Sequence, residues 1–130
     1  MILQTTLSLA AAAAVLAFWL ALRAGKVRFA AKVWHGDGEN PLLLRRMRAQ
    51  ANYVENTPFV LVLVAAIELS GKAGPWLAYV GAVYLLARIA HAFGMDKPDK
   101  SPLRAIGFIV TVLTLLGLAA VAALIAAGRF

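Results

Sequence analysis

Hydrophobic residues occur along this chain in long segments separated by short polar stretches. Residues 2–22 carry no charge, and neither do residues 105–127. Residues 75–93 form another apolar segment, which is interrupted only by Arg88 and His91. A helix needs about 20 predominantly apolar residues to cross the hydrocarbon core of a bilayer, and each of these segments has that length. The pattern predicts membrane-spanning helices at 2–22, 75–93 and 105–127.

One further helix, the second in chain order, is less apolar than the others. Asn40 is a residue type that caps helix N-termini and Pro41 suits the first helical position, so we expect a helix from there to residue 69. Its first half is charged, with Arg45, Arg46, Arg48 and Glu55. Residues 49–69 can therefore span the membrane only where the charged part is buried inside a bundle. The chain is predicted to be one all-α domain over residues 1–130, a four-helix membrane bundle.

Composition supports this interpretation and excludes others. The chain is 62% hydrophobic and 15% charged, which is too apolar for a disordered segment and for a water-soluble monomer. The absence of Cys excludes disulfides, thiolate nucleophiles and cysteine-bound metals. The net charge is +7, and most of the basic residues lie between the apolar segments, where they suit contact with anionic membrane lipid. Nucleic-acid binding is not predicted, because the sequence shows no basic groove interleaved with aromatic residues.

The distribution of positive charge predicts the orientation in the membrane. Residues 23–48 hold seven Lys or Arg residues and residues 94–104 hold three, whereas the other side has only Lys72 and Arg129. By the positive-inside rule, we expect the first and third loops in the cytoplasm and both termini outside. Because the basic residues follow the first apolar segment and none precedes it, we expect a span there rather than a signal peptide.

Polar residues inside the predicted spans are the candidate functional residues, because charges in a membrane are costly. Arg48, Asn52 and Glu55 share one helical face, and so do Tyr84, Arg88, His91 and Met95. Arg104 enters the last span at the same level. One interpretation is a structural ion pair between Glu55 and Arg88 that joins two helices.

The alternative interpretation is an anion site. Three arginines, Arg48, Arg88 and Arg104, face one carboxylate, Glu55, at one membrane depth. An excess of buried guanidinium groups implies an anionic ligand, and the planar guanidinium binds carboxylates well. Glu55 and Asn52 are then expected to offer acceptors to an ammonium or amide. Together these groups suit a small zwitterionic peptide with net negative charge.

Other chemistries lack support in the sequence. The two histidines, His35 and His91, have no carboxylates at metal-ligand spacing, so we expect no metal site. Ser70 and Ser101 lie in predicted turns without a nearby base, which argues against a nucleophilic triad. No glycine-rich phosphate loop precedes a helix.

Two stretches carry a family resemblance. Residues 45–59, Arg-Arg-Met-Arg-Ala-Gln-Ala-Asn-Tyr-Val-Glu-Asn-Thr-Pro-Phe, resemble the signature at the start of the second span in the MAPEG superfamily of microsomal glutathione transferases and leukotriene synthases. Arg45, Arg48, Ala49, Asn52 and Glu55 fit that signature, and Leu44 stands where it has Glu. Residues 83–94, Val-Tyr-Leu-Leu-Ala-Arg-Ile-Ala-His-Ala-Phe-Gly, resemble the family's third span.

The resemblance implies a homotrimer with glutathione, as co-substrate, held between subunits near the cytoplasmic face. Carried over by position, the glutathione-binding residues are Arg48, Gln50, Asn52, Glu55, Arg88 and either Lys26 or Arg28. Arg104 matches the arginine credited with stabilising the thiolate, which makes it the predicted catalytic residue. Where leukotriene synthase-like members have Tyr, this chain has Asn56, His91 and Met95, and we keep His91 among the binding residues.

The resemblance leads to one main functional hypothesis and to alternatives. The main hypothesis is a glutathione-dependent transferase or peroxidase in a bacterial inner membrane, acting on hydrophobic small molecules that arrive from the lipid. One alternative is a protein that binds glutathione or another anion without catalysis, as a sensor or scaffold. Another is a small transporter. The polar residues gather at one membrane face with none to continue a path across, which argues against transport.

Overall fold

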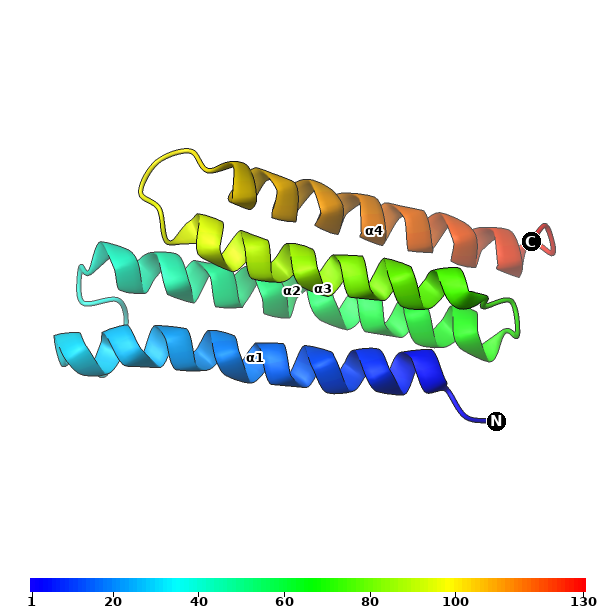
Figure 1. Cartoon of the computed structure of the whole chain (residues 1–130), viewed down its shortest axis with the longest axis horizontal. Coiled ribbons are helices and arrows are strands. Elements are labelled where there is room, and N and C mark those ends of the chain that lie inside the picture. Colours follow the sequence, from blue (N-terminus) through cyan, green and yellow to red (C-terminus); the bar gives the residue numbers. More distant parts are fainter.

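The computed structural model describes residues 1–130 as four helices that pack side by side with alternating direction (Figure 1). The helices are α1 (Gln4–Ala31), α2 (Pro41–Leu69), α3 (Pro75–Met95) and α4 (Pro102–Ala126). Both termini lie at the end of the bundle that holds the turn between α2 and α3. The α1–α2 and α3–α4 loops lie together at the opposite end, which we call the loop end. The predicted all-α four-helix membrane bundle is confirmed.

Local sequence explains where α2, α3 and α4 begin. The side chain of Asn40 accepts a hydrogen bond of 3.0 Å from the backbone N–H of Leu43, and Pro41 occupies the first turn, as predicted. Pro75 and Pro102 occupy the first turns of α3 and α4. Proline is favourable there because these positions need no N–H and already have the φ that proline imposes.

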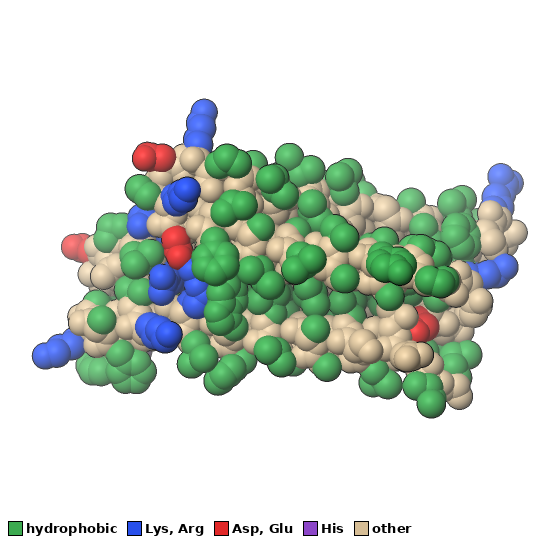
Figure 2. All heavy atoms as spheres, in the orientation of Figure 1, with side chains coloured by type: hydrophobic (Ala, Val, Ile, Leu, Met, Phe, Trp, Pro, Cys, Tyr) green, Lys and Arg blue, Asp and Glu red, His purple; other side chains and the backbone are tan.

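Three of the four helices, α1, α3 and α4, are long and apolar enough to cross a membrane by themselves. The exception, α2, carries its charges in the half that lies at the loop end. Aliphatic residues from all four helices form the core, among them Leu16, Val60, Leu77 and Leu118. Large hydrophobic residues also cover much of the outside along the length of the bundle, whereas Lys and Arg gather at the loop end (Figure 2). This surface is suited to lipid.

A cluster around Asp96 joins three helices at the loop end. The Asp96 carboxylate, directly after α3, pairs with Arg23 of α1 and with Arg46 of α2, the latter at 3.2 Å. The guanidinium carbon of Arg23 also lies 4.9 Å from the ring centroid of Trp19 and 5.0 Å from that of Phe93. The cluster thus neutralises part of the positive charge and fixes the start of the α3–α4 loop.

Glu68 makes a second polar connection at the other end of the bundle. Its carboxylate, on the last turn of α2, accepts hydrogen bonds of 2.8 and 2.7 Å from the backbone N–H groups of Thr5 and Thr6 in the first turn of α1. These N–H groups have no partner within their own helix, and α1 has no side-chain cap of its own. Glu68 therefore caps α1 from a different helix.

Glycines bring α3 and α4 into close contact. A Cβ atom on Gly107 of α4 would lie 2.7 Å from the carbonyl oxygen of Ala87 and 2.9 Å from the Cα of His91, both on α3. A Cβ atom on Gly94 of α3 would lie 2.7 Å from the Cα of Arg104. Small residues let helix backbones approach closely in membranes. Here they place Arg104 directly beside the end of α3.

Candidate functional site

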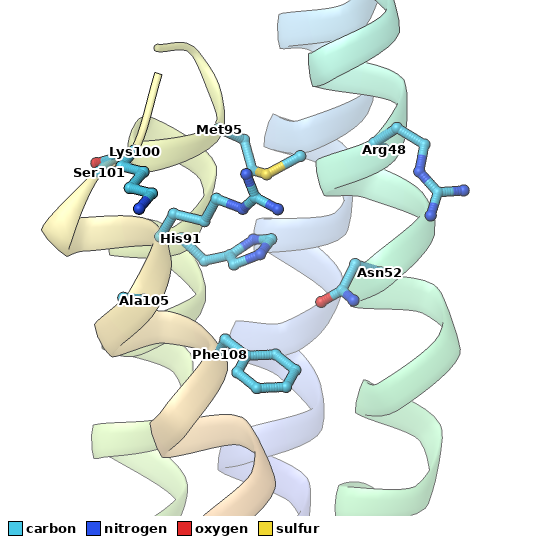
Figure 3. Close-up of a pocket in the computed structure, with 9 residues that line it drawn as sticks. Arg48, Asn52, His91, Met95, Lys100, Ser101, Ala105 and Phe108 are labelled. Carbon is cyan, nitrogen blue, oxygen red and sulfur yellow. The ribbon is translucent and has the colours of Figure 1, made fainter. Parts of the chain in front are cut away.

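A cavity of about 710 Å³ opens at the loop end between α2, α3 and α4 (Figure 3). Its size is within the range of small-molecule sites, about 300–1,000 Å³. The residues that line it are Arg48, Asn52, His91, Met95, Lys100, Ser101, Arg104, Ala105 and Phe108. Three of them are cationic at neutral pH, Arg48, Lys100 and Arg104, and none is acidic. Its electrostatics and donor groups favour an anion.

Arg88 lies in the wall behind this cavity and is the largest fully buried side chain, with 2% of its surface exposed. Its guanidinium donates to Asn52 Oδ1 at 2.6 Å and to Thr111 Oγ1 at 2.9 Å, and it lies 3.4 Å from Nδ1 of His91. Its Nε has no partner. No carboxylate pairs with Arg88, so its charge adds to the positive potential of the cavity.

The ion pair between Glu55 and Arg88, one of the two interpretations of the polar residues, does not form. The ion pairs of the structure are those of Asp96 with Arg23 and Arg46, and Glu55 is exposed on the outside of α2. Glu55 is three residues beyond Asn52 on α2. Its side chain therefore points about 60° away from that of Asn52 and lies about 4.5 Å further along the helix axis. Arg88 reaches Asn52 instead. Asn52 Oδ1 accepts one hydrogen bond from Arg88 and keeps a second lone pair, so the expectation that Asn52 offers an acceptor to a ligand stays a prediction.

The remaining arginines at the cavity are more accessible. Arg48 and Arg104 are both exposed and lie on α2 and on the first turn of α4. In Figure 3, Asn52 and His91 point toward one another, whereas the side chain of Arg48 extends to the far side of α2. The structure therefore brings Asn52, His91, Arg88 and Arg104 together and places Arg48 at the edge of the cavity.

Two other predicted residues lie on a different face of the molecule. Arg28 and Gln50 line a second cavity, of about 400 Å³, between α1 and α2. On a helix, positions 48 and 50 are about 200° apart, so Arg48 and Gln50 face nearly opposite directions. Arg28 donates to the backbone oxygens of Val33 and Gly36 and thereby holds the α1–α2 loop, while Lys26 is exposed and lines neither cavity.

Sequence reasoning missed four cavity residues: Lys100, Ser101, Ala105 and Phe108. Lys100 and Ser101 directly precede the first turn of α4, and a helix N-terminus with a neighbouring Lys is a signal for an anion that could have found them. Phe108 is one helical turn after Arg104, so the same helical-face argument that grouped the arginines would have placed it beside them.

Comparisons with known proteins identify the family to which the chain is similar. The model of the MAPEG family matches residues 6–124 of the chain. The chain is also 33% identical over 70 residues to "Inner membrane protein YecN" from Escherichia coli strain K12, and equally to that protein from Escherichia coli O6:H1. Each match covers 53% of this chain, and the chain spans about half the length of these relatives, 53% in each case.

Proposed function

This chain belongs to the MAPEG family, and from that premise we propose that it binds glutathione at the cationic cavity and that the glutathione sulfur attacks hydrophobic electrophiles. As a transferase it joins the glutathionyl group to the electrophile, and as a peroxidase it reduces a hydroperoxide while glutathione is oxidised to its disulfide. The observation that carries the proposal is the cavity lined by Arg48, Lys100 and Arg104 without an acidic residue. Glutathione has two carboxylates and one ammonium, so a site rich in guanidinium groups suits it. Guanidinium groups bind carboxylates through two parallel hydrogen bonds.

We assign separate roles to the two exposed arginines of the cavity. Arg48 holds a carboxylate of the peptide, and Arg104 faces the sulfur. A free thiol has a pKa of about 8.5, and a nearby guanidinium lowers it because the group keeps its own proton and favours the anion. Arg104 therefore activates the thiol without acting as a base. The lining residues Met95, Ala105 and Phe108 give the cavity an apolar side, which suits an electrophile that arrives from the lipid.

A homotrimer with its sites between subunits is part of the proposal, and two observations support it. First, the predicted ligands lie on two faces, Arg48 and Asn52 on one and Arg28 and Gln50 on the other. Contact between neighbouring copies would join the two faces into one site. Second, Glu55 is exposed nine residues beyond Arg46, which is about 13 Å further along α2. An exposed carboxylate at that depth is costly in lipid, so a neighbouring subunit that covers it is favoured.

The proposed location is a bacterial inner membrane, with the loop end in the cytoplasm. The positive charge at the loop end supports this orientation. The name of the related YecN protein supports the location. In this orientation the cavity opens toward cytoplasmic glutathione.

Binding and transfer are tested separately, because the same cavity also suits a protein that binds glutathione without catalysis. Calorimetry on the purified protein in mild detergent measures glutathione binding, and conjugation of an aromatic halide measures transfer. We expect both, with affinity lost in Arg48→Ala and retained in Lys97→Ala. Lys97 is a matched control because it is exposed at the loop end but does not line the cavity. Binding without conjugation would favour a sensor or scaffold, and absence of binding would refute the proposal.

A further inference from the structure

The position of hydrogens on the His91 ring follows from its neighbour Arg88. The Nη2 atom of Arg88 lies 3.4 Å from Nδ1 of His91. A guanidinium has only donors and does not lose its proton in proteins, so Nδ1 must supply the lone pair of this contact. The hydrogen of the neutral imidazole then lies on Nε2. Arg88 thus selects one tautomer of His91.

The Nε2 edge of His91 is free to contact a ligand. His91 is 5% exposed and lines the cavity, and its contact with Arg88 is its one side-chain hydrogen bond. In Figure 3 its ring extends from α3 toward Asn52. The amide of Asn52 is oriented in the same way, because its oxygen accepts from Arg88 and its NH₂ group remains available. Both side chains therefore offer donors.

The close contact between α3 and α4 places the Nε2–H donor of His91 near Arg104. Gly107 lies against His91, and Gly94 lies against Arg104. His91 and Gly94 are three residues apart on α3, as are Arg104 and Gly107 on α4. The side chains of His91 and Arg104 are therefore offset by about one helical turn along the axis of the bundle. Both line the same cavity.

We infer that His91, fixed by Arg88 as an Nε2–H donor, acts with Arg104 as a pair of donors that holds the anionic sulfur of the bound thiol peptide. The choice of sulfur as the acceptor rests on the proposed function. In this arrangement His91 is a donor and not a general base. When the S–H bond breaks, the electron pair stays on sulfur and the proton passes to water, while His91 keeps its own proton.

The tautomer is tested directly without any ligand. Nitrogen NMR of the protein labelled with ¹⁵N-histidine in detergent at neutral pH separates a protonated from an unprotonated ring nitrogen. The chain has only His35 and His91, so His35→Gln assigns the signals. We expect hydrogen on Nε2 of His91 and none on Nδ1. Hydrogen on Nδ1 would overturn the inference.

Variants test the contact with sulfur through the ultraviolet absorbance of the bound thiolate. His91→Gln keeps an N–H donor at a similar reach but cannot act as a base, and His91→Phe keeps a ring of similar size without a donor. We expect the ratio of bound thiolate to bound thiol in His91→Gln to match that of the unmodified protein, and this ratio in His91→Phe to fall about tenfold, as for losing one hydrogen bond to a charged group. His35→Gln is the matched control.

The outcomes separate this inference from the proposed function. A thiolate signal that is lost equally in His91→Gln and His91→Phe, or kept in both, would overturn the role of His91 as a donor to sulfur. If the unmodified protein bound no glutathione in calorimetry, the proposed function and the sulfur assignment would both fail. The NMR measurement would still decide whether Arg88 fixes His91 as a donor toward the cavity.

Discussion

Replacing Gly107 with Ala tests the close packing that places His91 beside Arg104. The new Cβ atom would lie 2.7 Å from the carbonyl oxygen of Ala87 and 2.9 Å from the Cα of His91. Non-bonded carbon atoms are most stable at about 3.5–4.0 Å, so α4 must move away by on the order of 1 Å. Overpacking of this kind costs about 1–3 kcal/mol of the free energy of unfolding.

Gly117→Ala is the matched control, because it makes the same change on the same helix where a Cβ atom meets nothing within 4 Å. Each variant gains about 0.8–1.0 kcal/mol from the higher helix propensity of Ala. Their difference therefore isolates the packing cost, and we expect Gly107→Ala to be less stable than Gly117→Ala by about 1–3 kcal/mol.

The assay is equilibrium unfolding of the purified protein by sodium dodecyl sulfate in mild detergent, followed by circular dichroism. The two variants are compared with the unmodified protein, and the thiolate absorbance of bound glutathione is measured on the folded fraction. We expect a weaker thiolate absorbance in Gly107→Ala only, because α4 carries Arg104 away from His91. Equal stability of the two variants would refute the close approach of α3 and α4.

Three further predictions concern stability, orientation and assembly. Asp96→Asn should lower the free energy of unfolding by about 1.5–3 kcal/mol, the range for hydrogen bonds to a charged group, because the half-buried Asp96 carboxylate pairs with Arg23 and Arg46, whereas exposed Asp99→Asn should not; equal effects would contradict the Asp96 cluster. In intact cells, Lys97→Cys should resist a membrane-impermeant thiol reagent and Lys72→Cys should react, since the natural chain has no Cys; the reverse pattern would invert the orientation. Chemical cross-linking in mild detergent should stop at three chains, and a series that ends at two would contradict the trimer.

The fold was largely predictable, because its determinants are local. Charge-free segments mark α1 and α4, and the Asn40–Pro41 pair marks the start of α2. The charged first half of α2 required the additional argument that it lies inside a bundle. Hydrophobic length alone still identifies only three spanning helices.

The site was less predictable, because periodicity defines which residues share a face but not how two helices are rotated against each other. The helical-face pattern grouped Asn52 with Glu55, but only the packed structure shows that Arg88 contacts Asn52. The pairing of Asp96 with Arg23 joins residues 73 positions apart, and no local pattern predicts it. The close contacts of Gly94 and Gly107 that bring His91 and Arg104 to neighbouring turns also depend on tertiary packing.

The central claim, that Arg104 stabilises the glutathione thiolate, is tested most directly by ultraviolet difference absorbance of bound glutathione at neutral pH. Arg104 contacts the reacting sulfur, so its loss should affect the thiolate and the reaction rate more than the affinity for glutathione. Arg48 contributes to glutathione binding throughout the reaction. We predict that Arg104→Ala binds glutathione with near-normal affinity in calorimetry but loses the thiolate signal, while Lys97→Ala keeps both. A normal thiolate signal in Arg104→Ala, or the same loss of affinity in Arg104→Ala and Arg48→Ala, would contradict the claim.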